Sequence, residues 1–290
     1  MIDEANAPES GEALLPGVLY VVATPLGDAG DLSPRAARVL AGADMVLAED
    51  TRRAGLLFSR LGIVRRSGQG FTSFHEHNET QRTPAVLERL EAGESVAMVS
   101  DAGTPLLSDP GYRLVRACRE KGLRVTPVPG PSAPLAALSA CGLPPYPFTF
   151  LGFPPRKSAQ AVRFFAAHRD TGATLVFFER KTRLQESMAA AYEALGAREF
   201  CVCRELTKPY EEFLQGTLDR LECLGREFLG EITVVIGPAP EGERSSEDEV
   251  RRAMERESQA GGKPKEVARR VAEQVRGWTA KEVYAMDRTS

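Results

Sequence analysis

The sequence lacks long hydrophobic runs and an excess of positive charge. No stretch of about 18 apolar residues occurs, so we expect no membrane-spanning helix and no membrane partner. Residues 1–17 are acidic and lack the basic start and apolar core of a signal peptide, so we interpret them as a disordered leader and predict a cytoplasmic protein. The chain has 37 Lys and Arg against 40 Asp and Glu, so a polyanion would have to bind at a local basic patch.

Cysteine is also scarce, and several signature motifs are missing. The five cysteines are odd in number and scattered, which is unlike a disulfide framework, and no Cys/His set completes a metal site, so we predict buried core thiols. The dinucleotide fingerprint Gly-x-Gly-x-x-Gly, the P-loop and the Gly-x-Ser-x-Gly elbow do not occur. These absences disfavour NAD binding, nucleotide hydrolysis and a serine hydrolase triad.

The pattern that is present predicts α/β architecture. A length of 290 residues suggests about two domains at roughly 150 residues each. Over 18–130, unbroken apolar runs alternate with amphipathic stretches, which predicts a parallel sheet with crossover helices. Over 131–240, helices and closely linked strands predict a mixed sheet, and the polar segment 238–249 predicts a boundary before a C-terminal helical module at 245–290.

In parallel sheets, ligands bind beyond the carboxyl ends of the strands, so the loops there are the candidate site. The loop VSDAGTPLLSDPGY (99–112) concentrates Gly, Pro and two carboxylates, Asp101 and Asp109. For Asp109 alone we favour a structural role, as a helix cap with Pro110 in the first turn. Ser132 stands near another helix start, where backbone N–H groups lack partners, and Asp50 and Arg52 follow the second strand.

Two further groups of residues are candidates for substrate contact. His75, His77 and Asn78 lie in FHEHNE, where a His-x-His pair without further ligands favours substrate contact or a polar loop over a metal site. Arg156, Lys157 and Arg183 lie on connections of the second domain, where they would either pair with RNA phosphates or be ordinary surface charge.

Taken in order, these segments resemble a known family. VVATPLGDAGDLS, LAEDTRR, FHEHNE, VSDAGTPLLSDPGY, VPGPSAPLAALSACGLP and FLGFPPRKS are similar to the family of the ribosomal RNA small subunit methyltransferases I, within the tetrapyrrole methylase superfamily. The resemblance continues through RELTKPYEE into KPKEVARRVAEQV and covers nearly everything after Gly17. Asp28, where the family pattern suggests Asn, and Thr182, where it suggests His, depart from it.

The resemblance implies a two-domain tetrapyrrole methylase-like fold, a homodimer, and S-adenosylmethionine as cofactor. It implies transfer of a methyl group to the 2′-hydroxyl of a cytidine in the decoding centre of 16S rRNA, on the small ribosomal subunit. It also implies that the C-terminal helices face RNA. By position in the family pattern, the cofactor site would be lined by Leu26, Asp101, Gly103, Ser132, Ala133, Phe178, Cys203, Leu206 and Ile232.

Methylation of a ribose hydroxyl needs a group that accepts its proton during attack. Candidate acceptors are Asp101, Glu79 and His75, and Asp101 has the alternative role of orienting the cofactor. Arg52, Arg156, Lys157 and the locally basic tail at 261–290 would hold phosphates. Two alternatives stay open: a tetrapyrrole or diphthine-type methylase on the same scaffold, and a non-catalytic RNA-binding assembly factor.

Overall fold

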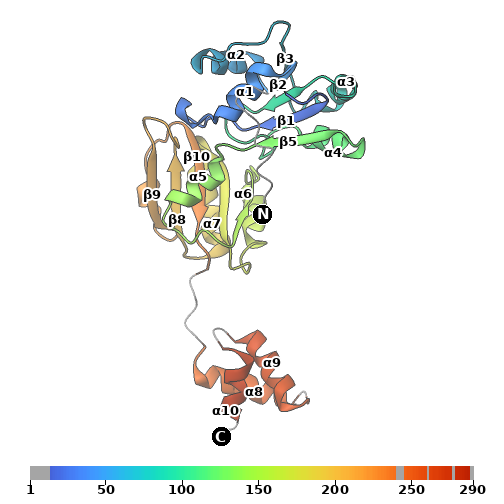
Figure 1. The fold of residues 1–290 in the computed structure, drawn as a ribbon. Helices are drawn as coiled ribbons and strands as arrows, with labels where there is room; N and C mark the ends of the chain where they lie inside the picture. Colours follow the sequence, from blue (N-terminus) through green and yellow to red (C-terminus); the bar gives the residue numbers. More distant parts are fainter. Residues whose placement is uncertain (1–13, 240–244, 260, 276–277, 288–290) are drawn as a thin grey trace. The chain divides into compact units, whose positions relative to one another are not determined.

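The computed structural model describes residues 14–239, 245–259, 261–275 and 278–287, and these divide into two compact units. One unit contains two five-stranded sheets, and the other contains the C-terminal helices (Figure 1). Most of the predicted leader, residues 1–13, lies outside the described residues. Leu14, at its end, packs against the core of the first sheet.

The first sheet is parallel throughout, as the sequence predicts. Its strands stand in the order β3-β2-β4-β1-β5, with every adjacent pair parallel. Their bounds are β1 (Val18–Val22), β2 (Met45–Ala48), β3 (Gly70–Ser73), β4 (Val96–Val99) and β5 (Arg124–Val128). All four residues of β2 and of β4 are buried, because helices cover both faces of the sheet.

Two helices contribute to the core on each face of this sheet. The helices α1 (Pro34–Gly42) and α2 (Thr51–Arg60) pack in one cluster, and α3 (Glu79–Glu91) and α4 (Tyr112–Glu120) pack in another. The Ser33 hydroxyl caps α1 by accepting from the Ala36 N–H, and Pro34 occupies the first turn, where its missing N–H costs no helix hydrogen bond. A short 3-10 turn (Ala29–Asp31) precedes α1.

The second sheet is mixed, which also agrees with the prediction. Its order is β6-β7-β10-β8-β9; β6 runs parallel to β7 and the other pairs are antiparallel. The helix α5 packs in one cluster of the sheet, and α6 and α7 pack in another. The bounds are α5 (Ala133–Ala140), β6 (Phe148–Phe150), α6 (Ser158–Ala166), β7 (Thr174–Arg180), α7 (Leu184–Leu195), β8 (Glu199–Arg204), β9 (Glu212–Thr217) and β10 (Glu231–Ile236).

The second unit is a small helical module with a core of its own. It comprises α8 (Glu247–Gln259), α9 (Pro264–Gln274) and α10 (Ala280–Asp287). Val267 and Val271 of α9 are buried against Val250 of α8 and Val283 of α10, because residues spaced four apart lie on one helix face.

The buried thiols partly match the prediction. Four of the five cysteines are buried and none is in a disulfide, whereas Cys223 is exposed. Within the described ranges, no helix is both long enough and apolar enough to cross a bilayer. In the same residues, no group of three or more His, Cys, Asp or Glu side chains is arranged to hold a metal ion.

The structural role expected for Asp109 is wrong. Asp109 does not cap a helix, because α4 begins at Tyr112 with Gly111 at the N-cap. The free N–H groups at this helix start are instead satisfied by the buried carboxylate of Glu79, which reaches over from α3. Its Oε1 accepts from the N–H of Gly111 at 3.1 Å and of Arg113 at 3.0 Å. Glu79 therefore supplies the cap from a distant part of the chain, which leaves Asp109 without that role.

Candidate functional site

A cavity of about 640 Å³ lies where the loops of the two sheets meet, within the first unit. The size is in the range of pockets for small organic ligands. From the first half of the chain it is lined by Leu26, by residues 102–104 and 107–109, and by 132–134. From the second half it is lined by Phe153, 178–182, Cys203, Leu206 and 230–233.

The loop between β4 and α4 forms one wall and is tied to its neighbours by hydrogen bonds. Gly103 and Thr24 exchange two backbone hydrogen bonds of 2.9 and 3.0 Å, which join the ends of β4 and β1. Thr104 donates its hydroxyl to the Pro131 carbonyl at 2.9 Å, which adds the exit of β5. Gly103 has φ +78°, and a Cβ there would approach Leu26 to 3.1 Å, so glycine fits this turn best.

Side chains near one end of the three central strands of the second sheet form the other wall. Thr233 of β10 pairs with both Phe178 of β7 and Cys203 of β8, so these three residues are neighbours across the strands. Phe153 packs on Phe178 with ring centroids 5.5 Å apart and remains half exposed at the pocket. A hydrogen bond from Cys203 to Cys201, 3.8 Å between sulfurs, together with burial raises the pKa of the Cys203 thiol. These side chains are uncharged, whereas Glu179, Arg180, Lys181 and Glu231 add charged groups to the lining from the same half of the chain.

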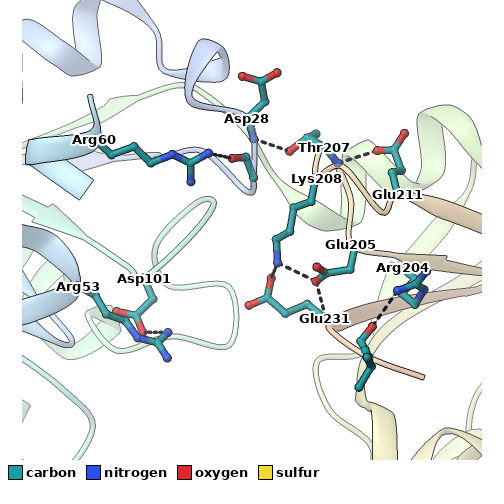
Figure 2. A network of polar contacts seen from close by, with 12 residues as sticks. Asp28, Arg53, Arg60, Asp101, Arg204, Glu205, Thr207, Lys208, Glu211 and Glu231 are labelled. Atoms are coloured by element: carbon teal, nitrogen blue, oxygen red, sulfur yellow. Dashed lines mark hydrogen bonds and ion pairs between the residues drawn. The ribbon is translucent and has the colours of Figure 1, made fainter. Parts of the chain in front are cut away.

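The two walls are joined by a direct contact between loops, which we call the clasp: Gly27 and Asp28 against Thr207 and Lys208 (Figure 2). The Asp28 N–H donates to the Thr207 hydroxyl at 3.2 Å. A Cβ on Gly27 would lie 2.3 Å from Lys208 Cγ and 3.0 Å from its backbone nitrogen. Lys208 is itself fixed by ion pairs to Glu205 and Glu231, at 2.8 and 2.9 Å.

Of the nine predicted cofactor residues, the pocket brings together eight, and Asp101 is the exception. The Asp101 carboxylate forms an ion pair with Arg53 at 2.7 Å instead (Figure 2). Asp28, the departure from the family pattern, directs its carboxylate to its own turn, where Oδ1 accepts from the Gly30 N–H at 2.8 Å. The additional negative charge of Asp28 is thus not among the groups that line the pocket.

None of the three predicted proton acceptors is among the lining residues. Glu79 is buried and caps α4. His75 lies in the turn before α3, where its backbone N–H donates to the Asn78 side-chain oxygen at 2.8 Å. Asn78 occupies the N-cap position of α3, but its side chain bonds this turn rather than the helix. His77 stacks edge-on against His75, with ring centroids 6.0 Å apart.

Some of the predicted substrate contacts bond other residues of the protein, and others are exposed. Asp50 caps α2 and pairs with the exposed Arg52 at 3.1 Å, and this guanidinium lowers the pKa of Asp50 to about 2. The Arg183 guanidinium donates to the carbonyls of Pro154 and Pro155, at 3.4 and 2.8 Å, and so braces the turn that carries Arg156 and Lys157. Arg156 and Lys157 themselves are exposed.

Sequence reasoning missed several lining groups, among them Asp109, the segment 179–182 and Phe153. For Asp109 the local pattern predicts a helix cap, yet the residue lines the pocket beside Ser108. Burial, with smaller contributions from the nearby carboxylates of Glu49 and Asp101, raises the pKa of Asp109 to about 6. From the segment 179–182 only Thr182 stands out in the sequence, as a departure from the family pattern, yet all four residues line the pocket. Two aspartates in one post-strand loop were the available signal for the first of these groups.

Known proteins match this chain in sequence and in fold. The family model of the tetrapyrrole (corrin/porphyrin) methylases matches residues 18–222 of the sequence. A protein of Mesorhizobium japonicum named ribosomal RNA small subunit methyltransferase I is 49% identical over 225 residues, covering 76% of this chain and 75% of that protein. A protein of Micromonospora olivasterospora with the same name is 39% identical over 285 residues, covering 96% of this chain and 88% of its own length.

Two solved structures share the fold. A diphthine synthase superimposes with a TM-score of 0.58 at 15% identity, covering 76% of this chain and 89% of its own. The uroporphyrin-III C-methyl transferase of Thermus thermophilus, solved with S-adenosylhomocysteine, has a TM-score of 0.53 at 20% identity, covering 76% and 96%. The match to the family model and the identity to relatives across most of both chains lead to one conclusion: the chain belongs to the tetrapyrrole methylases, in the family of the ribosomal RNA small subunit methyltransferases I.

Proposed function

We propose that this chain uses S-adenosylmethionine to methylate the 2′-hydroxyl of a cytidine ribose in the decoding centre of 16S rRNA. The observation that carries the proposal is the pocket at the meeting of the two sheets, in a chain whose relatives are named for methylation of small-subunit rRNA. The cofactor supplies a methyl group on a positively charged sulfonium, and that charge disappears when the methyl group leaves.

The lining fits such a cofactor. Leu26, Leu206, Phe178 and Ile232 offer apolar surface for an adenosine, and the backbone N–H groups of Ala102 and Thr104 offer polar partners. Arg180 and Lys181 are exposed residues of the lining, whereas the carboxylate of Asp109 is partly buried. Because no buried, unpaired cation lines the site among the described residues, the lining does not repel a sulfonium. The apolar part of the lining excludes water that would solvate the bound cofactor.

Two exposed features near the pocket suit an RNA substrate. Phe153 lines the pocket with half of its surface exposed, and aromatic rings in such positions stack on bases that are turned out of an RNA strand. Arg156 and Lys157 follow three residues later and have no ion-pair partner among the described residues. The Arg183 brace holds the turn before them, so both cations start from a fixed backbone.

The helical module is proposed to add RNA affinity. Residues 261–290 contain seven Lys and Arg against four Asp and Glu, in a chain that is acidic as a whole. The relative that aligns over 96% of this chain extends the similarity into this region. A homodimer and a cytoplasmic location belong to the same proposal, and sedimentation of the purified protein tests the first of them.

The proposal is tested with labelled S-adenosylmethionine and 30S subunits that lack the modification. We expect labelled 2′-O-methylcytidine in the recovered 16S rRNA. Recovered rRNA without this labelled nucleoside would contradict the proposal. Lys157→Glu should lower RNA affinity and weaken its salt dependence. Arg124→Glu is the matched control, because Arg124 is also exposed but begins β5, at the end of the strand away from the pocket. Methylation of a tetrapyrrole in place of rRNA would favour the other branch of the superfamily.

A further inference from the structure

Asp109 holds an unusual position among the charged groups of the pocket. Five charged side chains line the cavity: Asp109, Glu179, Arg180, Lys181 and Glu231. Glu179 is buried and fully used, because it accepts from the Arg180 N–H at 2.7 Å and from the Ser187 hydroxyl, and forms an ion pair with Arg183 at 3.6 Å. Glu231 is exposed and pairs with Lys208. Asp109 is the lining carboxylate that, among the described residues, has no cationic partner.

The backbone around Asp109 is fixed in a way that holds its side chain in place. Ser108 has φ +71° and Gly111 has φ +124°, so left-handed residues stand on both sides of the Asp109–Pro110 pair. Pro110 restricts the preceding residue to extended backbone. A Cβ on Gly152, in the loop after β6, would approach the Ser108 hydroxyl to 3.3 Å, so the second half of the chain packs against this segment.

The surroundings of Asp109 raise the pKa of its carboxyl, so the group is ionised near neutral pH and still binds a proton well. From the end of β2 comes Glu49, and from the end of β4 come Asp101, which Arg53 partly neutralises, and the Ser100 hydroxyl. Burial raises the pKa of Asp109 to about 6, Glu49 and Asp101 add to the rise, and a hydrogen bond with Ser100 opposes it. A carboxylate with such a pKa is ionised at pH 7.5 and binds a proton more strongly than an ordinary one.

We propose that Asp109 is the catalytic residue that accepts the proton of the attacking hydroxyl, an inference that rests on the function proposed above. One oxygen electron pair forms the new O–C bond while the C–S bond breaks, its electron pair stays on sulfur as a neutral thioether, and the hydroxyl proton moves to the Asp109 carboxylate. The three acceptors expected from sequence are less suitable. Glu79 caps a helix, His75 lies outside the lining, and Asp101 is paired with Arg53.

The test compares Asp109→Asn with Asp219→Asn, a matched control at an exposed aspartate outside the pocket. Single-turnover methylation of 30S subunits at pH 7.5 should fall by about 10²- to 10⁴-fold in Asp109→Asn and stay unchanged in the control. Calorimetry should show S-adenosylhomocysteine binding within threefold of wild type. A rate for Asp109→Asn above one tenth of wild type would overturn the inference, and so would a loss of S-adenosylhomocysteine binding that accounts for the lost rate.

A second variant and a direct titration give readouts that do not depend on turnover alone. In carbon-13 spectra, one aspartate carboxyl should titrate near pH 6 and disappear in Asp109→Asn. Glu49→Gln removes a neighbouring negative charge, so this titration and the acid limb of the rate profile should both move to lower pH. An unmoved acid limb would refute the role of Asp109. If wild-type protein methylates no rRNA while the carboxyl still titrates near pH 6, the proposed function fails instead.

Discussion

Replacing Gly27 by alanine tests whether the clasp keeps the two walls of the pocket together. The new Cβ would lie 2.3 Å from Lys208 Cγ and 3.0 Å from both the Lys208 nitrogen and the Thr207 carbonyl carbon. The backbone atoms cannot turn aside, and the Lys208 side chain is fixed by two ion pairs. Overpacking of this kind costs about 1–3 kcal/mol, and relief requires the two loops to separate.

That separation would move Leu26 away from Leu206, the lining residues next to the clasp. If the whole cost appears in binding, the Kd for S-adenosylhomocysteine rises about 5- to 150-fold, since 1.4 kcal/mol is a factor of ten. Calorimetry measures the affinity, and thermal melting measures any part of the cost that appears as lost stability. Gly55→Ala in α2 is the control, because a Cβ there meets nothing within 4 Å. Unchanged affinity and unchanged Tm in Gly27→Ala would refute the argument.

Three further predictions concern stability and thiol reactivity. Burial opposes the ionisation of Asp44, but hydrogen bonds from Ser95 and the charge of Arg66 outweigh it and lower the pKa of Asp44. Urea titrations at pH 7 should therefore show that Asp44→Asn loses about 1–3 kcal/mol of unfolding free energy. This difference from wild type should vanish as the pH falls below the pKa of Asp44 in the folded protein. Glu79→Gln should melt at a lower temperature, because a neutral amide caps α4 less well, yet should retain most methylation activity at 25 °C. Ellman titration of the native protein should detect one fast thiol, Cys223, and the reaction of all five at one rate would contradict the burial of the others.

The sequence predicts the strands well because their signal is local. The runs that became β2 and β4 are apolar throughout, and a parallel sheet covered on both faces requires that pattern. The lining residues that follow strands of the first sheet were predictable for a related reason, because the carboxyl ends of parallel strands meet at one edge of the sheet. Family resemblance then selected Cys203 and Leu206, which local patterns alone do not single out.

The failures have a different cause, which is contact over long separations in the chain. Asp109 followed by Pro110 has the local pattern of a helix cap, but the buried Glu79 already serves that helix start from more than thirty residues away. Likewise, Arg183 has the pattern of a phosphate ligand but bonds the carbonyls of Pro154 and Pro155, some 28 residues earlier. Local sequence shows what a residue is able to do, and its tertiary partners decide which of these roles remains available.

Two leucines that line the pocket, Leu107 and Leu206, each stand between residues with left-handed backbone. Leu106 and Ser108 have φ of +74° and +71°, and Glu205 and Thr207 have φ of +52° and +61°. Conformations of this kind cost of order 1–3 kcal/mol each for residues other than glycine. Two loops of the cavity are thus strained and held in place by their packing, and a bound ligand would restrain them further. Occupancy should therefore slow amide exchange at these two loops more than anywhere in the sheets behind them.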